Sequence, residues 1–202
     1  MQSVQHLLQK NIPAVKNEKV LICVDTVFGL PKPLKVLPVN LFKFAKNYTF
    51  LGKPFGAITA YEFFSHFLKS SKIQHRKVEL LVKANSVLNL QPYQKNIGCG
   101  SFRIIKNLAT GTKWFSLWPF DKLDKQFIIA EGYPSYFWRT QIKSSHRNLD
   151  VLKKKFTKLK FKNMDQADSF VLAFGASRST RNLLDSKIIC KYEGWILGVP
   201  YV

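Results

Sequence analysis

Short apolar runs that alternate with segments of helical periodicity constrain the fold of this chain most. Residues 19–24 form one brief run with β-branched side chains, and residues 114–118 and 126–130 form two more. Runs of this length with turn signals beyond them are typical of buried strands. Apolar side chains recur at every third or fourth position in residues 57–70, and residues 164–176 form a largely apolar segment; both predict helices. Strands interspersed with helices predict an α/β protein.

Four further segments carry weaker signals. Residues 77–88 fit a helix or a strand, with the helix favoured, and residues 101–108 have the spacing of a short helix. Residues 148–162 predict a basic helix with one apolar face, and residues 188–199 predict a strand or a hairpin. With 202 residues, 46% of them apolar, the chain is long enough for one substantial core. We therefore expect residues 1–202 to form a single domain.

The few acidic residues of the chain lie at the ends of these elements. Asp25 directly follows the first strand-like run, and Glu131 directly follows the third. In open α/β sheets ligands bind beyond the carboxyl ends of the strands, and carboxylate oxygens are ligands that Mg²⁺ prefers. An acid after a strand can equally cap a turn. Both interpretations stay open for Asp25 and Glu131.

Asp165 and Asp168 open the helix predicted over residues 164–176 and share one face of it. Acids in a first turn also stabilise a helix through its dipole. The rest of this helix is apolar nearly all round, which indicates burial. Acids in its first turn should then face a cleft, a partner charge or a metal. We predict that at least one is a site residue, with Asp168 favoured over Asp165.

The net charge of the chain is +20, because 32 Lys and Arg stand against 12 Asp and Glu. A field of this sign attracts polyanions, so nucleic acid, either DNA or RNA, is the expected partner. A general abundance of lysine would produce the same charge without such a partner. Two basic clusters, one after Trp138 and one in the helix at 148–162, are candidates for contact with the phosphate backbone. Their candidate residues are Arg139, Lys143, Arg147, Lys153, Lys154 and Lys158.

Other chemistries lack their motifs in this sequence. The three cysteines are far apart and show no zinc-ligand spacing, and neither a nucleophile elbow nor a phosphate-binding loop occurs. No apolar run reaches the roughly 20 residues that span a bilayer, and the first ten residues lack the apolar core of a secretory signal. We therefore expect a protein of the reducing cytoplasm without a membrane partner. The sequence does not indicate its oligomeric state.

Four short motifs occur in order along the chain. They are Asp-Thr-Val-Phe-Gly-Leu-Pro from Asp25, Glu-Gly-Tyr-Pro from Glu131, Asp-Gln-Ala-Asp from Asp165, and Glu-Gly-Trp-Ile from Glu193. Together they resemble the motifs of an uncharacterised family of predicted nucleases with an RNase H-like fold. In that family a His often precedes the third motif, whereas this chain has Met164 there.

The resemblance implies an RNase H-like mixed sheet flanked by helices and metal-dependent cleavage of nucleic acid. It implies catalytic roles for Asp25, Glu131, Asp165 and Asp168. We expect Asp25, Glu131 and Asp168 to bind Mg²⁺ or Mn²⁺, which would activate a water and stabilise the leaving oxygen. RNase H-like folds begin with a hairpin whose first strand bears a catalytic Asp, but no acid precedes Glu18 here. We therefore expect the N-terminal hairpin to be missing and Asp25 to be a second carboxylate.

Three functions are compatible with these patterns. The first is a metal-dependent nuclease or other nucleic-acid-processing protein. The second is a catalytically inactive, basic nucleic-acid-binding module of the same fold, because loss of one metal ligand can abolish catalysis and leave binding intact. The third is an enzyme that acts on a small phosphorylated molecule, since the same carboxylates would serve it.

Overall fold

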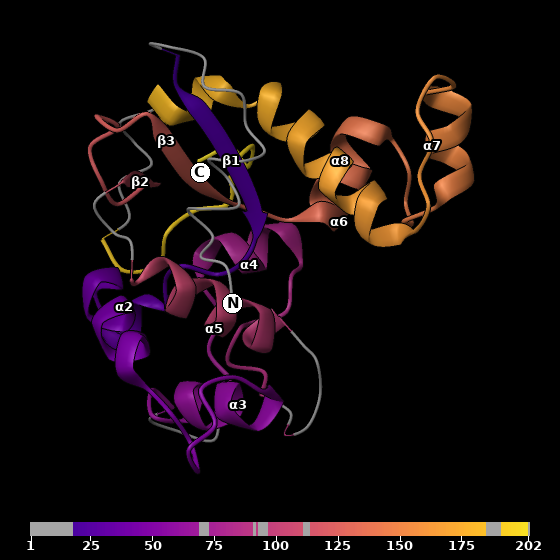
Figure 1. Cartoon of the computed structure of the whole chain (residues 1–202). Helices are drawn as coiled ribbons and strands as arrows, with labels where there is room; N and C mark the ends of the chain where they lie inside the picture. Colours follow the sequence, from indigo (N-terminus) through magenta and orange to yellow (C-terminus); the bar gives the residue numbers. More distant parts are fainter. Residues whose placement is uncertain are drawn as a thin grey trace.

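A three-stranded parallel sheet forms the centre of the protein (Figure 1). The computed structural model describes residues 18–68, 73–90, 92, 97–110, 114–184 and 191–201. The strands are β1 (Val20–Asp25), β2 (Phe115–Trp118) and β3 (Phe127–Gly132), in the spatial order β1-β3-β2. Together with the helices around the sheet they confirm the predicted α/β class.

The strand register brings the ends of β1 and β3 to the same edge of the sheet. Val20 is paired with Phe127, and Asp25 is paired with Gly132. Glu131 therefore lies opposite Val24, one position before Asp25. The two acids that follow apolar runs in the sequence are thus brought close together by parallel pairing.

The connection between β2 and β3 is short for parallel strands. Only residues 119–126 separate them, whereas parallel neighbours usually need about a dozen residues or more. The hydroxyl of Ser116 donates to the carbonyl of Lys122 (2.7 Å) and accepts from the backbone N–H of Lys125 (3.3 Å), which folds the connection back along β2. Within the described residues all three strands of this sheet are parallel. The resemblance implies a mixed sheet, so this expectation differs from the structure.

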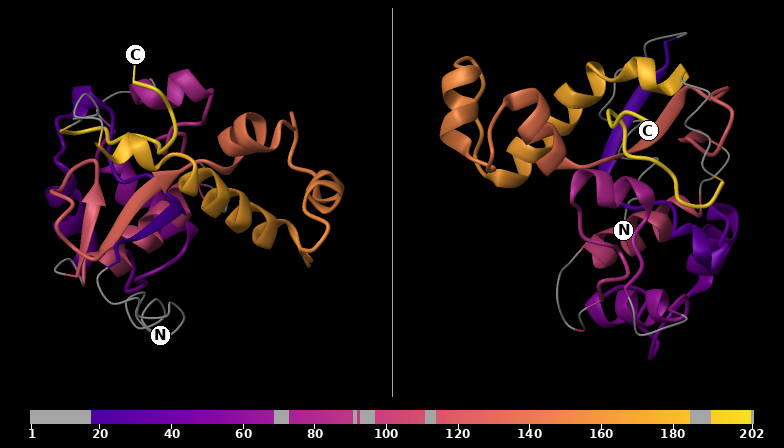
Figure 2. Two further views of the ribbon diagram at one scale, coloured as in Figure 1. Left: turned by 90° about the horizontal axis from the view of Figure 1, so that it is seen from above. Right: turned by 180° about the vertical axis from the view of Figure 1, so that it is seen from behind.

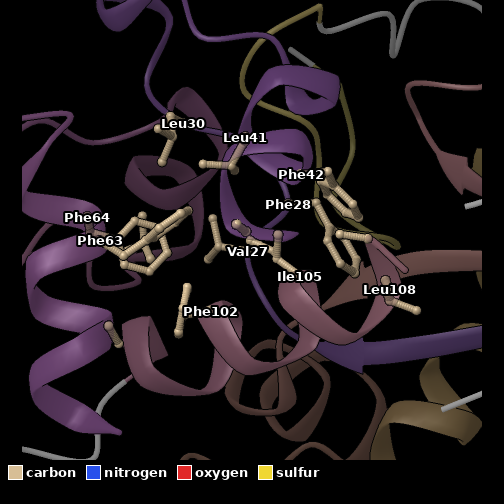
Figure 3. Close-up of a cluster of buried hydrophobic side chains, with 14 of the residues drawn as sticks. Val27, Phe28, Leu30, Leu41, Phe42, Phe63, Phe64, Phe102, Ile105 and Leu108 are labelled. Atoms are coloured by element: carbon tan, nitrogen blue, oxygen red, sulfur yellow. The ribbon is translucent and has the colours of Figure 1, made fainter. Parts of the chain in front are cut away.

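One face of the sheet is covered by α2 (Pro38–Asn47), α3 (Ala57–Ser65) and α5 (Ile97–Leu108). Ile22 and Ile129 point to this side, because successive side chains of a strand alternate between its two faces. The core between sheet and helices is rich in phenylalanine (Figure 3). Phe63 of α3 and Phe102 of α5 are fully buried, with 4.7 Å between their ring centroids.

Helix α2 has no counterpart among the predicted elements. Pro38 stands in its first turn, where the missing N–H of proline costs no helical bond. At its other end the ammonium group of Lys106 donates to the carbonyls of Ala45 (3.1 Å), Lys46 (3.2 Å) and Tyr48 (2.6 Å). These are the carbonyls that a helix end leaves without internal partners. The stabilising group lies about 60 residues away in sequence, beyond the reach of local patterns.

The opposite face of the sheet is covered by α4 (Lys77–Val82), part of α8 (Met164–Ser177) and residues 191–201. In this last segment Trp195 is buried and its indole N–H donates to the carbonyl of Val199 (2.8 Å). The described ranges also include the 3₁₀ helices η1 (Lys32–Leu34) and η3 (Thr180–Leu184).

The C-terminal segment is not the strand or hairpin predicted over residues 188–199. Residues 185–190 lie outside the described part of the chain. From residue 191 onward the backbone turns, and a single bridge joins Ile196 to Glu131. Gly194 (φ +69°) and Gly198 (φ +86°) adopt left-handed conformations that interrupt extended backbone.

A helical extension follows β3 and projects away from the sheet. It contains α6 (Pro134–Phe137), the π-helix η2 (Trp138–Ile142), α7 (Leu149–Lys155) and the first half of α8. Both views of Figure 2 show α7 beyond α8, at the far end of this extension. Buried side chains from all four helices, with Phe137, Trp138, Leu152 and Val171 among them, form its own small core.

Several predicted helices differ in length from those observed. Residues 164–177 confirm the helix predicted over 164–176, but α3 ends at Ser65 and α4 at Val82. The basic helix predicted over 148–162 ends at Lys155. Phe156 leaves the helix to pack its ring on α8, and Leu159, expected on the apolar face, is exposed. No helix in the described ranges is both long enough and apolar enough to cross a bilayer.

Candidate functional site at the carboxyl ends of the strands

A cleft of about 590 Å³ lies at the edge of the sheet where β1 and β3 end. Its walls come from Asp25–Val27 after β1, residues 131–135 around the end of β3, α4 with the loop that follows it, and the start of α5. This is the edge at which open α/β sheets bind ligands, and the volume lies in the range of small-molecule sites. The sequence places Asp25 and Glu131 there, and the structure adds Arg76, Glu79 and Arg147.

Arg76 holds Glu131 at the bottom of the cleft. Its Nη1 and Nη2 atoms donate to the two carboxylate oxygens of Glu131 at 2.7 Å and 2.5 Å. Its Nε donates to Glu79 (2.8 Å), and its Nη1 also donates to the carbonyl of Glu193 (2.9 Å). Arg76 and Glu131 are 1% and 3% exposed, so the pair is desolvated and bidentate. Both oxygens of Glu131 are already engaged.

Burial and charge oppose each other in this pair. Burial raises the pKa of Glu131 above its ordinary value, although the charge of Arg76 acts to lower it. Burial acts to lower the pKa of Arg76, but Glu131 and Glu79 outweigh this effect and raise it. The raised pKa of Glu131 favours a neutral acid, whereas the two hydrogen bonds from one guanidinium favour a carboxylate. We assign the ionised pair, because both oxygens of Glu131 accept.

Arg76 also begins α4. Its backbone N–H donates to Glu79 (2.8 Å), three residues further on, in the manner of a capping box. The side chain of Glu193 accepts from the backbone N–H groups of Lys32 (2.7 Å) and Lys77 (3.1 Å) and so joins η1 and α4. These contacts fix the start of α4 against the edge of the sheet.

Asp168 joins three parts of the helical extension: α8, η2 and the loop before α7. One of its oxygens accepts from the indole N–H of Trp138 (2.7 Å), and the other accepts from Nη1 of Arg147 (2.8 Å). Trp138 is 1% exposed, so its N–H has no access to water. Asp165, one turn earlier on α8, is exposed and makes no side-chain hydrogen bond within the described residues. Of the two acids, Asp168 therefore has the defined environment.

Asp25 differs from the other carboxylates of the cleft. Its side chain is accessible to solvent, and it accepts no hydrogen bond from the described part of the chain. Enough protein surrounds it that desolvation raises its pKa from 3.8 to about 6; Asp168 adds to this rise and Arg147 opposes it. The next residue, Thr26, is 1% exposed and lines the same cleft, and its hydroxyl also lacks a partner among the described residues.

The predicted carboxylate cluster forms only in part. Asp25 and Asp168 are near enough to influence each other electrostatically, Glu131 lies in the same cleft, and Asp165 lies outside it. The described residues contain no group of three or more His, Cys, Asp or Glu that could hold a metal. In this arrangement both oxygens of Glu131 accept from the guanidinium of Arg76, and the two oxygens of Asp168 accept from Arg147 and from the indole N–H of Trp138. They do not fit a two-metal centre as they stand, and the Mg²⁺ or Mn²⁺ site stays a prediction.

The basic residues predicted to meet a phosphate backbone lie on and beside the helical extension. Residues 143–163, which we call the basic arm, carry eight Lys and Arg and one acid, Asp150, a net charge of +7. Lys143, Lys154 and Lys158 are exposed, and Lys153 lies 3.7 Å from Asp150. The other two predicted residues have structural partners. Arg139 donates to the carbonyl of Val82 (2.9 Å), and Arg147 pairs with Asp168.

Sequence reasoning missed Arg76 and Thr26. The only local sign of Arg76 is the spacing to Glu79, which fits an N-terminal cap but is weak by itself. Its main partner, Glu131, is 55 residues away. Thr26 follows Asp25 directly, and the burial of its hydroxyl becomes visible only when the surrounding chain is in place.

No protein-family model, no curated protein and no solved structure matches this chain. The resemblance to RNase H-like nucleases therefore rests on the four sequence motifs.

Proposed function

We propose that this protein is a nucleic-acid-binding module of RNase H-like architecture whose carboxylate positions serve structure rather than metal catalysis. One observation carries the proposal: two of the three acids expected to bind metal, Glu131 and Asp168, accept hydrogen bonds from the guanidinium groups of Arg76 and Arg147. An arginine at each of these acids supplies the positive charge that an ion would otherwise bring.

The fold and the order of the motifs support the RNase H-like part of the proposal. β1 and β3 are adjacent and parallel, and the first two motifs begin at their shared edge, at Asp25 and Glu131. The third motif opens α8, which packs against β1. The fourth lies beside β3, where Ile196 forms a bridge with Glu131. The four motifs are therefore close in space as well as ordered in sequence.

The basic arm supports the choice of nucleic acid as the partner. The arm carries a charge of +7 on 21 residues, and its helix α7 lies at the far end of the helical extension (Figure 2). Contacts between lysine and phosphate release counterions, so the affinity should fall steeply as salt rises. They do not depend on base sequence, and we propose that both DNA and RNA bind.

The test is the salt dependence of binding to labelled single-stranded DNA and RNA, followed by fluorescence anisotropy. We expect the affinity to fall by about a hundredfold or more between roughly 50 and 200 mM salt if several phosphates are contacted. An affinity that does not change with salt would contradict the proposal.

A metal-dependent nuclease is the second candidate, and the state of Asp25 favours it. This carboxylate lies in the cleft, is close to Asp168 and accepts no hydrogen bond from the described residues. The test is cleavage of single- and double-stranded substrates in Mn²⁺ by the purified protein beside its Asp25→Asn variant. Cleavage that requires Asp25 would favour the nuclease over the binding module. Cleavage that is absent, or unchanged in the variant, would exclude it.

We also propose that the protein acts in the reducing cytoplasm. Cys23 is a free thiol in the structure. Burial, with the nearby charges of Glu131 and Asp25, raises the pKa of Cys23 to about 12, so little of the reactive thiolate forms there. Reaction of the folded protein with a thiol reagent, followed by mass spectrometry, should leave Cys23 unmodified.

A further inference from the structure

The cleft at the ends of β1 and β3 contains a carboxylate, Asp25, and a hydroxyl, Thr26, that have no hydrogen-bond partner in the described part of the chain. Five charged residues line it, and all but Asp25 form ion pairs within the described part of the chain. Thr26 adds a buried hydroxyl that lacks a partner within the described residues. Buried polar groups normally have partners, so such a hydroxyl beside an accessible carboxylate indicates that a ligand supplies the missing hydrogen bonds.

The charges of the cleft disfavour phosphate as the group that enters it. Three carboxylates and two guanidinium groups line the walls, which leaves a net negative charge. Exposed lysines lie outside it, on the basic arm. A nucleic-acid strand would therefore keep its phosphates on the arm and direct the N–H groups of a base toward Asp25.

The remaining walls suit a flat ring. Tyr133, which directly follows β3, and the apolar side chains of Ile97 and Ile196 line the cleft. Aromatic side chains stack on unpaired bases in many complexes with single strands. The volume of about 590 Å³ is sufficient for one nucleotide.

We propose that this cleft binds one unstacked guanine base of a single-stranded nucleic acid, with Asp25 accepting from its Watson–Crick edge and Thr26 donating to it. This inference rests on the proposed nucleic-acid binding. Guanine presents two adjacent N–H donors, at N1 and N2, followed by a carbonyl oxygen. A carboxylate accepts from two adjacent donors, and a hydroxyl can donate to the carbonyl. Asp25 and Thr26 both line the cleft, and neither side chain has a hydrogen-bond partner in the described part of the chain.

The other bases match this pair of residues less well. Adenine and cytosine present one amino group beside a ring nitrogen that only accepts, and uracil and thymine present one N–H between two carbonyls. Each would bring an acceptor against the carboxylate, which leaves a hydrogen bond unmade and adds repulsion. The cleft should therefore select guanine among the bases of DNA and RNA.

The experiment compares two labelled RNA oligonucleotides of about twelve nucleotides, one of uridine alone and one with a single central guanosine. At neutral pH and about 100 mM salt we expect the guanosine oligonucleotide to bind about tenfold more tightly, because the carboxylate makes two charge-assisted hydrogen bonds. Inosine at the same position lacks the N2 amino group and should lose most of this preference.

Two variants assign the preference to the cleft. Asp25→Asn replaces one acceptor by a donor and should abolish the preference while the oligo-uridine still binds. Thr26→Val removes the hydroxyl at similar volume and should reduce the preference while Asp25 is still in place. Asp124→Asn is the matched control. It makes the same change of charge in the loop before β3, at the end of that strand opposite to the cleft, and should leave the preference intact.

Three outcomes would overturn the inference. Equal affinity of the wild-type protein for both oligonucleotides excludes a guanine site but leaves salt-dependent binding by the basic arm standing. A preference that survives in both Asp25→Asn and Thr26→Val places guanine recognition elsewhere. Failure to bind either oligonucleotide even at low salt overturns the proposed function, and the guanine site with it.

Discussion

At the scale of single residues, Asp168 shows how one side chain can satisfy the criteria for two different roles. A carboxylate at the mouth of a buried helix is where a metal ligand is expected, yet here it accepts from Trp138 and Arg147. The indole N–H of Trp138 is buried, so removal of its acceptor would leave a donor without water or protein partner. Asp168 is therefore explained by the stability of the helical extension.

We predict that Asp168→Ala lowers the free energy of unfolding by about 1–3 kcal/mol, because it orphans the buried N–H of Trp138. Asp168→Asn retains an acceptor oxygen and should cost less. Urea denaturation in the presence of a chelator measures both. Wild-type stability of Asp168→Ala under these conditions would show that the bond to Trp138 contributes nothing.

Asp25 has the opposite character, because its environment opposes its charge. Desolvation and Asp168 raise its pKa from 3.8 to about 6, and Arg147 lowers it only in part. A raised pKa of an acid means that the folded state binds the proton more tightly, so ionisation costs stability above the folded pKa and costs nothing below the unfolded one. Asp25→Asn should then raise the melting temperature at neutral pH.

This gain should shrink as the pH falls through about 6 and vanish below 3.8, where Asp25 is protonated in both states. Thermal unfolding of the two proteins across this pH range tests it. A lower melting temperature of Asp25→Asn at neutral pH would be incompatible with the environment described.

At the scale of elements, the position of α4 depends on the ion pairs of Arg76. The guanidinium joins the start of the helix to β3 through Glu131 and to the C-terminal segment through the carbonyl of Glu193. Breaking a buried ion pair costs more than replacing it whole, because the surviving charge is left without compensation.

We predict that Arg76→Leu destabilises the protein by about 3–5 kcal/mol, since it leaves Glu131 and Glu79 buried without a counter-charge. Glu131→Leu alone should also be destabilising. The double variant should lose less stability than the sum of the two, and a double-mutant cycle by chemical denaturation gives the coupling. Additive losses would mean that the two side chains do not stabilise each other.

The same elements show how far the sequence alone can lead. The three strands and α8 could be predicted because short apolar runs and helical spacing are local signals. Local signals also placed Asp25 and Glu131 at strand ends. The partners of these acids could not be predicted, because Arg76 reaches Glu131 across 55 residues and Lys106 reaches α2 across about 60. The length of α7 depended likewise on the packing of Phe156 against α8.

At the scale of the whole molecule, negative and positive charge lie in two different regions, the cleft and the basic arm. The cleft at the sheet edge has a net negative lining, whereas the basic arm lies away from the sheet and holds +7 of the +20 net charge. Asp168 and Arg147 connect the two, because Arg147 belongs to the arm and also lines the cleft. We propose that a nucleic-acid strand bound along the arm would reach the cleft through this connection.

The arm can be tested through its exposed lysines. Lys153, Lys154 and Lys158 are suited to replacement because they are exposed, whereas Lys155 donates to the carbonyls of Gln141 and Ile142. We predict that the triple Lys→Ala variant weakens single-strand binding and lowers the slope of log affinity against log salt by about 2, since each phosphate that a lysine neutralises adds about 0.7 to that slope. Fluorescence anisotropy over a salt series measures the slope.

A matched control separates the arm from the charge of the whole protein. Lys35, Lys43 and Lys46 are exposed on and before α2, on the far side of the molecule from α7 (Figure 1). Their triple Lys→Ala variant has the same net charge as the arm variant. If the arm itself binds the backbone, this control should keep the wild-type slope. If both variants lower the slope equally, the protein attracts nucleic acid through its overall field, and the arm has no special part in binding.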